Sequence, residues 1–482
     1  MKKIFLPLLL LSTLCFANEY QEWLKKEQNS YQQFKKNHDD AFADMLKKDW
    51  EAFNSMYNPT PYKAPKPKEL PKVKEVIKLP QKAIEDSVIV KIVPIEKPVI
   101  HYVAPKPQPI VPPIQKEIID PNIKKITFDF YSNTIDITYH KEIAFLQTRV
   151  NKESISDFWA RFSNSNYQEL LAQFEKYNRA LNLNDWAKYL LIHDAGMKIY
   201  KTENMANLFT WFVLTKMHYD IKVGYNSHNI YLLSNVKHNL FQVAFFRLNN
   251  KKYYILTPLG KISNVPSIYT YQGNHEEATN ALSFEFKKPI LFNTNVATKE
   301  LHFEYNQKKY DFTSQYSMDL VNFYKTFPQS DYQIYYDAQN STDILNSLII
   351  QLQTLVKNKT ELEAVNLILR FVQTSFAYKT DQEQFSYEKV FFPEETLFYP
   401  YSDCEDRSIL FNLLVKNVLN LDVLGLKYKD HMSSAVAFSS NVGGDGFVYE
   451  GKRFTVADPT YINANVGVSM PQYKNSSYSV IQ

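Results

Sequence analysis

Three side chains near the end of the chain are of types that together carry out nucleophilic thiol chemistry. Cys404 lies at the start of an apolar-periodic run, residues 408–418, which predicts a buried helix. At a helix start, the N–H groups without intrahelical acceptors and the positive end of the dipole favour the thiolate over the thiol. His431 opens a strand-like run, and Asp458 closes a later one, at equal intervals of 27 residues. We therefore expect a thiol, an imidazole and a carboxylate to meet at one site.

The residues around these three resemble the transglutaminase-like superfamily, which has a papain-like core. The matching features are Asp-Cys-x-Asp at a helix start (403–406), the histidine that opens a strand, and Asp-Pro-Thr at the end of a strand (458–460). Ser402 is a departure, since the family often has Gly there. The resemblance covers residues 341–471 and implies a papain-like fold for this part of the chain.

The resemblance implies a role for each of the three side chains. Cys404 would be the nucleophile, His431 the base and Asp458 the acid that orients the base. Hydrolysis of a peptide or isopeptide bond is the first expectation, with a protein or peptide as substrate. Amide cross-linking shares these steps and differs in the acyl acceptor, so the sequence leaves both reactions open. We expect no cofactor and no metal, because there is no zinc-type Cys/His spacing and no glycine-rich phosphate loop.

Further residues near the thiol are candidates for supporting roles. The backbone N–H of Cys404 is the expected donor to an oxyanion. Tyr399 and Tyr401 lie in an aromatic and proline-containing stretch before the thiol and are candidates for the walls of a substrate groove. Asp403 and Asp406 suit the cap and the positive end of the helix, although their charges oppose a thiolate.

The composition is that of a folded protein with two or three domains. The 482 residues are 45% hydrophobic and 15% aromatic, which is enough for several cores. The 55 basic and 51 acidic side chains nearly balance, at a formal net charge of +4, so we expect no nucleic-acid role. The fold class we expect is α+β.

The first 17 residues have the pattern of a secretory signal peptide. Two lysines precede an apolar run that ends in small residues at Ala17, where we expect cleavage. Lipid attachment at Cys15 is the alternative, but the bulky Leu14 before it is unlike a lipoprotein signal. The prediction is export to the periplasm or cell envelope, without a transmembrane segment after cleavage. Cys404 would then be the single thiol in an oxidising compartment, which favours catalytic use over an inert buried cysteine.

The next two segments are candidates for partner binding. Residues 18–57 carry aromatic side chains among Lys, Glu and Gln and predict an amphipathic helix or helix pair, which would dock, oligomerise or lie on a membrane surface. Residues 58–121 are rich in Pro and Lys and predict an extended, polyproline-type linker. A protein or an envelope polymer is the partner that these segments would bind.

The remaining chain divides into three predicted parts, two of which are similar. We expect an α+β domain at 122–262, a β-rich module at 263–340 and the transglutaminase-like domain at 341–482. At displacements of 202 and 201 residues, 208–213 overlays 410–415 and 251–258 overlays 452–459.

This overlay gives the reactive positions a counterpart in the first half of the chain. Thr202, Asn229 and Thr257 occupy the places of the nucleophile, the imidazole and the carboxylate. We hypothesise that residues 150–262 are a degenerate copy that has lost all three groups. Chance similarity between two generic helix–strand–strand units is the alternative. A catalytically silent envelope scaffold or binding protein is the alternative function.

Overall fold

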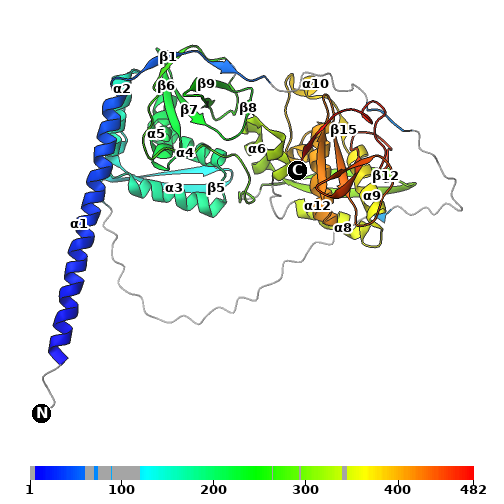
Figure 1. Cartoon of the computed structure of the whole chain (residues 1–482), viewed down its shortest axis with the longest axis horizontal. Coiled ribbons are helices and arrows are strands. Elements are labelled where there is room, and N and C mark those ends of the chain that lie inside the picture. Colours follow the sequence, from blue (N-terminus) through cyan, green and yellow to red (C-terminus); the bar gives the residue numbers. More distant parts are fainter. Residues whose placement is uncertain are drawn as a thin grey trace.

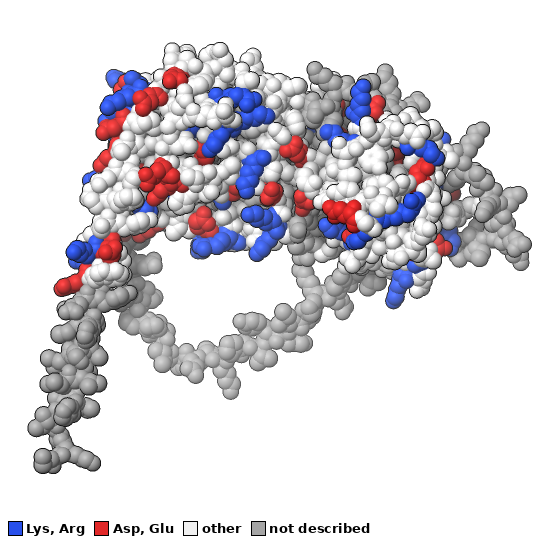
Figure 2. Space-filling view, viewed as in Figure 1, with Lys and Arg blue, Asp and Glu red and all other residues white. Residues whose placement is uncertain are grey.

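The computed structural model describes residues 6–59, 70–73, 88–89, 120–262, 264–292, 295–338 and 345–482. These residues form an α+β protein of more than one domain, as the sequence predicts. Figure 1 shows two compact bodies side by side, the first in cyan and green and the second in yellow to red, with α1 projecting from the first. Figure 2 shows acidic and basic side chains interspersed on the face in view, so this face has no extended area of one sign.

The helices are α1 (Leu6–Leu46), η1 (Lys141–Ile143), α2 (Lys152–Ser163), α3 (Gln168–Leu181), α4 (Asp185–Tyr200), α5 (Glu203–Lys216), α6 (Met318–Thr326), α7 (Tyr332–Asp337), α8 (Leu345–Val356), α9 (Glu361–Thr374), α10 (Asp381–Phe385), α11 (Pro393–Phe398) and α12 (Cys404–Leu419). The strands are β1 (Glu51–Phe53), β2 (Met56–Tyr57), β3 (Val88–Ile89), β4 (Ile123–Phe130), β5 (Asn133–His140), β6 (Ile221–Tyr225), β7 (Ile230–Asn235), β8 (Leu240–Phe241), β9 (Ala244–Leu248), β10 (Lys251–Leu256), β11 (Ile268–Thr270), β12 (Val296–Tyr305), β13 (Lys308–Ser317), β14 (Gln329–Ser330), β15 (Ala377–Tyr378), β16 (Tyr401–Ser402), β17 (Val423–Lys427), β18 (Met432–Ala437), β19 (Gly446–Tyr449), β20 (Lys452–Ala457) and β21 (Ser479–Ile481).

The last part of α1 belongs to the first core. Phe42 packs edge-to-face on Trp159, with 4.7 Å between ring centroids. The buried Asp39 pairs with Lys216 and lies 3.3 Å from His275 Nε2. Burial alone would raise the pKa of Asp39, but these two partners outweigh it and hold the pKa below its usual range.

The helix predicted for residues 18–57 ends earlier than the sequence pattern indicates. The expected cleavage point after Ala17 lies inside α1, which stops at Leu46. Residues 47–57 are instead a turn and two short strands, because their backbone groups pair with both ends of one sheet. Among the described residues, none of the helices combines the length and the apolar character needed to cross a bilayer.

Each body contains an antiparallel sheet with a buried helix packed on it. The first sheet has the order β1-β11-β6-β7-β10-β9-β2, and α5 packs on β6 and β7. Only Asn54 and Ser55 separate β1 from β2. Because these two strands are at opposite ends of the strand order, this segment closes the sheet on itself. The second sheet has the order β19-β20-β18-β17-β21, and α12 packs on β17 and β18.

The two sheets share their strand order and their pairing register. The order β11-β6-β7-β10-β9 corresponds to β21-β17-β18-β20-β19. Ile221 pairs with Ser234 and Val423 pairs with Val436, so both partners are displaced by 202 positions. In the next pair, β10 against β7 and β20 against β18, the added strand is displaced by 201 positions. These are the displacements at which the two sequences overlay.

The reactive positions have similar places in both units, residues 202–270 (first unit) and 404–481 (second unit). In the first unit, Thr202 directly precedes α5, Asn229 directly precedes β7, and Thr257 directly follows β10. In the second unit, Cys404 begins α12, His431 directly precedes β18, and Asp458 directly follows β20.

The strands expected to form a separate β-rich module at 263–340 are divided between the two bodies. β11 completes the first sheet, whereas the β12–β13 hairpin packs on α9 and α8 of the second body. Residues 282–286 form an extended loop and 332–337 are helical. Residues 263–340 therefore do not form one sheet. The hairpin side chains are apolar on one face because they share the core of the second body.

Most of the predicted linker, 58–121, lies outside the described residues. Two of its described pieces pair with the second body: residues 70–73 with Ile462, and β3 in parallel with β13. The linker therefore contacts the second body at two places.

Candidate active site

The start of α12 is fixed by a buried carboxylate. Asp403 N donates to Asp406 Oδ2 (3.1 Å), and Phe391 N donates to Asp406 Oδ1 (2.9 Å). Asp406 thus ties the first turn of the helix to the aromatic stretch that precedes it. Cys404 is the first residue of α12, so its N–H is one of the donors that have no acceptor within the helix.

A buried guanidinium lies one position beyond this turn. Arg407 donates to Ser402 Oγ (3.2 Å), Gln373 O (3.1 Å) and Phe376 O (2.7 Å). Burial lowers the pKa of Arg407 to about 10, and the charges of neighbouring acids oppose this shift. Cys404 also interacts electrostatically with this cation. The sequence reasoning did not single out Arg407.

His431 and Asp458 form a buried hydrogen-bonded pair. His431 Nε2 lies 2.8 Å from Asp458 Oδ2, and the two residues are 5% and 2% exposed. Asp458 Oδ1 accepts from Thr460 N and Oγ1, both at 2.9 Å. Burial alone would raise the pKa of Asp458, but the charge of His431 and the hydrogen bonds from His431 and Thr460 outweigh it and hold the pKa below the usual range. The carboxylate is therefore ionised and orients the ring.

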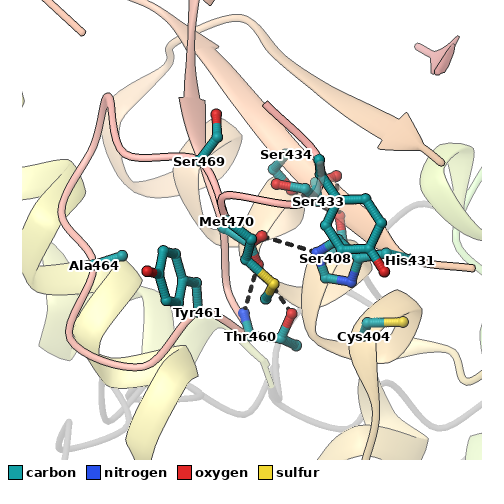
Figure 3. A network of polar contacts seen from close by, with 12 residues as sticks. Cys404, Ser408, His431, Ser433, Ser434, Thr460, Tyr461, Ala464, Ser469 and Met470 are labelled. Carbon is teal, nitrogen blue, oxygen red and sulfur yellow. Dashed lines mark hydrogen bonds and ion pairs between the residues drawn. The ribbon is translucent and has the colours of Figure 1, made fainter. Parts of the chain in front are cut away.

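The second ring nitrogen of His431 is available for a proton from the thiol. Among the described residues, His431 Nδ1 is buried and has no hydrogen-bond partner. Figure 3 shows Cys404 at the start of α12 beneath the His431 ring, with this nitrogen on the side of the thiol. The structure thus brings the three predicted residues into one site.

The thiol is enclosed in this structure. Cys404 is 2% exposed, and its Sγ donates to Glu405 Oε2 at 3.1 Å. The ring of Tyr473 stacks on His431 at 4.7 Å, with 15° between the planes, and its hydroxyl donates to Asp430 Oδ1 (3.0 Å). A carbonyl substrate would reach the sulfur only after part of this cover moves.

One buried glutamine holds the loop that carries Asp458. Gln373 Nε2 donates to the carbonyl oxygens of Asp458 (3.0 Å), Tyr461 (2.8 Å) and Ala464 (3.0 Å). Gln373 Oε1 accepts from Asn463 N at 3.2 Å. Like Arg407, Gln373 is a polar residue on an apolar helix face, and this is the signal by which the sequence could have identified it.

The two tyrosines expected as groove walls differ in their surroundings. Tyr399 stacks on Phe391 at 4.7 Å and packs edge-on against Phe385, within a cluster of aromatic rings. Tyr401 is 37% exposed and lies in β16, with the ammonium group of Lys379 5.1 Å from its ring centroid. Tyr401 is thus the more accessible of the two.

Several acids near the thiol have ligand atoms close enough to hold a cation. Within each group the ligand atoms are no more than 4.8 Å apart, and the groups share members. The groups are Asp403, Cys404 and Glu405; Asp381, Asp403 and Asp406; and Asp381, Glu388 and Glu405.

No family model, no curated protein and no solved structure matches the chain.

Proposed function

We propose that this chain is an exported cysteine acyl-transfer enzyme of transglutaminase-like type that hydrolyses peptide or isopeptide bonds. The observation that carries the proposal is the buried 2.8 Å pair of His431 and Asp458, placed over the helix start that bears Cys404. A thiol, a base with one open nitrogen and an acid that orients the base are the groups that such a reaction requires.

The reaction begins with proton transfer from Cys404 Sγ to His431 Nδ1. The thiolate attacks the substrate carbonyl, and an S–C bond forms as the carbonyl becomes an oxyanion. The N–H of Cys404 at the start of α12 is the donor we assign to that oxyanion. His431 then protonates the departing amine, the C–N bond breaks and a thioester remains. Water, deprotonated by His431, releases the carboxylic acid and restores the thiol.

The enclosed thiol adds a step before this chemistry. Because Sγ donates to Glu405 and is buried, the side chain has to turn from Glu405 toward His431 when substrate enters. Displacement of the Tyr473 ring would uncover the His431 imidazole and exchange the ring stacking for contact with substrate.

A thiol-reactive probe tests the proposal directly. We expect the full-length chain to be alkylated at Cys404, and the rate to fall at least tenfold in His431→Ala, because the base generates the thiolate. His302→Ala is a matched control, since His302 lies on β12 of the same body and is exposed. Equal rates in wild type and His431→Ala would show an unactivated thiol and refute the proposal.

A catalytically silent scaffold is the second candidate, and the first unit favours it. The first unit has the same strand order and register as the second, yet Thr202, Asn229 and Thr257 stand at its reactive positions. A fold of this kind can therefore be kept without the chemistry. A wild type in which Cys404 is inert to the probe, while the chain still binds a protein or envelope polymer through its N-terminal part, would support the scaffold.

Export is the remaining part of the proposal. The mass of the protein recovered from the envelope fraction should correspond to a chain that begins after Ala17. A mass increased by acyl chains at Cys15 would support lipid attachment instead, and an intact N-terminus in the cytosolic fraction would refute export.

A further inference from the structure

A short piece of the proline-rich segment lies against a loop of the second body and forms an isolated β-bridge with it. Ile462 N donates to Pro71 O (3.1 Å), Val73 N donates to Ile462 O (3.0 Å), and Lys72 forms the parallel bridge. Asn463 Nδ2 donates to Val73 O at 3.3 Å, across 390 positions of sequence. Since the contact is made through the main chain, it has the form in which an extended peptide is recognised by a sheet edge or loop.

Most side chains of this piece are partly buried against the body. Leu70, Pro71 and Val73 are half-buried, and Lys72 is exposed. Pro71 has no N–H, so the piece offers few backbone donors to the body. A contact of a few hydrogen bonds, in which none of the apolar side chains is fully buried, opens at low free-energy cost, and another peptide can therefore replace it.

The receiving backbone belongs to the loop that carries the catalytic acid. Ile462 follows Asp458 by four positions, and Gln373 holds the carbonyls on both sides of it, those of Tyr461 and Ala464. Figure 3 shows Thr460 close to Cys404 and His431, with Tyr461 and Ala464 farther along the same loop. A peptide bound at this loop therefore contacts the loop that carries the catalytic acid.

The linker has a second attachment that keeps this piece near its binding place. β3 pairs in parallel with β13, at Val88 with Tyr310 and Ile89 with Asp311. The pairing of β3 with β13 keeps residues 70–73 near Ile462 and so raises their effective concentration there. The piece therefore competes with any free peptide.

We propose that the backbone at Ile462 and Asn463 is a binding subsite for an extended, proline-containing peptide, and that residues 70–73 occupy it in cis. Residues 70–73 then compete with the peptide substrate, and this competition rests on the proposed function. The binding subsite itself does not depend on catalysis.

Peptide binding tests the subsite in the full chain carrying Cys404→Ala. The probe is a fluorescent peptide with the sequence of residues 68–76, measured by anisotropy. Adding Val73→Pro removes the N–H that bonds Ile462 O, so the intramolecular competitor is weakened and the peptide should bind at least about tenfold more tightly. Val73→Ala keeps that N–H, and a smaller gain is expected there. Equal affinity in all three chains would overturn the subsite.

A change in the peptide gives a second test, in which the same chain is used for both peptides. N-methylation at the position of Val73 removes the same donor from the probe, and this peptide should lose at least tenfold in affinity for the Val73→Pro chain. Unchanged affinity of the methylated peptide would overturn recognition through the backbone.

Labelling of Cys404 then connects the subsite to the reactive group. With Cys404 present, Val73→Pro should be labelled faster than Val73→Ala, and added peptide should slow the labelling. Peptide binding with no effect on labelling overturns the competition with substrate. Absence of labelling in every variant would refute the proposed function, and the binding result would still stand.

Discussion

Ser408 Oγ lies 2.7 Å from Ser434 Oγ, and this contact joins α12 to β18. Ser408 is one helical turn after Cys404, and Ser434 is three residues after His431. Ser408 also donates to Ser433 O at 2.9 Å. The two serines thus set the separation between the helix that carries the thiol and the strand that carries the base.

Removal of the Ser408 hydrogen bonds should slow the reaction of the Cys404 thiol. In Ser408→Ala the carbonyl of Ser433 loses a buried donor, and we expect the free energy of unfolding to fall by about 1–3 kcal/mol. We also expect slower alkylation of Cys404, measured at a temperature where the variant is fully folded. Ser477→Ala changes an exposed serine of the same body and should leave both quantities unchanged. A folded Ser408→Ala chain with the wild-type rate would contradict the positioning role.

Asp458→Asn should reduce activity because it alters the charge and the orientation of His431. The amide is similar in size to the carboxylate, but it neither stabilises the imidazolium nor holds the ring in the required tautomer. The rate of Cys404 alkylation, and of peptide hydrolysis once a substrate is found, should fall by about two to four orders of magnitude. Asp422→Asn is the control, because Asp422 is exposed and forms a surface ion pair with Lys452. A rate within a factor of about two of wild type would show that Asp458 does not orient the base.

The stability contributed by Asp458 should depend on pH in a defined direction. Its pKa in the folded protein is lower than its ordinary value of 3.8, so between these two values the unfolded chain binds more protons than the folded one. Stability therefore falls as pH falls through this range, and the contribution is complete above the ordinary pKa. The difference in free energy of unfolding between wild type and Asp458→Asn should shrink as pH is lowered from about 5 to about 3. Urea unfolding at each pH measures this difference, and a difference that grows toward low pH would contradict the assignment.

Sequence periodicity predicts the helices, whose backbone hydrogen bonds are local, and the antiparallel strand pairs. The β4–β5 hairpin turns at Tyr131 and Ser132, both with positive φ, and its strands pair residue by residue along their whole length. The displacement between the two overlaid sequences equals the displacement in strand pairing, because a one-residue change of register would turn each side chain to the other face.

The features missed by sequence reasoning depend on contacts between distant parts of the chain. The helix expected through Tyr57 ends at Leu46 because the first sheet takes up the following backbone at both ends. Arg407 shows no motif, and its role follows from three acceptors contributed by other elements. The bond from Cys404 to Glu405 likewise depends on side-chain orientation, which spacing along a helix does not determine.

Glu405→Gln should make the thiol more reactive. Glu405 is buried and accepts the hydrogen bond from Cys404 Sγ, so a thiolate would form beside its negative charge. Glutamine keeps the size and removes that charge, and we expect alkylation at neutral pH to be faster by about twofold to tenfold. Glu304→Gln, an exposed change on β12, should leave the rate unchanged. Slower alkylation in Glu405→Gln would mean that Glu405 supports the thiolate.

Gln373→Met should loosen the loop of the catalytic acid. Methionine has a similar length, but it donates no hydrogen bond, so the carbonyls of Asp458, Tyr461 and Ala464 lose a shared buried donor. We expect the free energy of unfolding to fall by about 2–4 kcal/mol, since more than one polar group loses its partner. Because the same loop holds Asp458 against His431, alkylation of Cys404 should also slow, and binding of the 68–76 peptide should weaken. Gln353→Met on α8 is an exposed control. If Gln373→Met lowers stability but leaves both alkylation and peptide binding unchanged, then the loop is held by other contacts, and Gln373 serves the core of the second body alone.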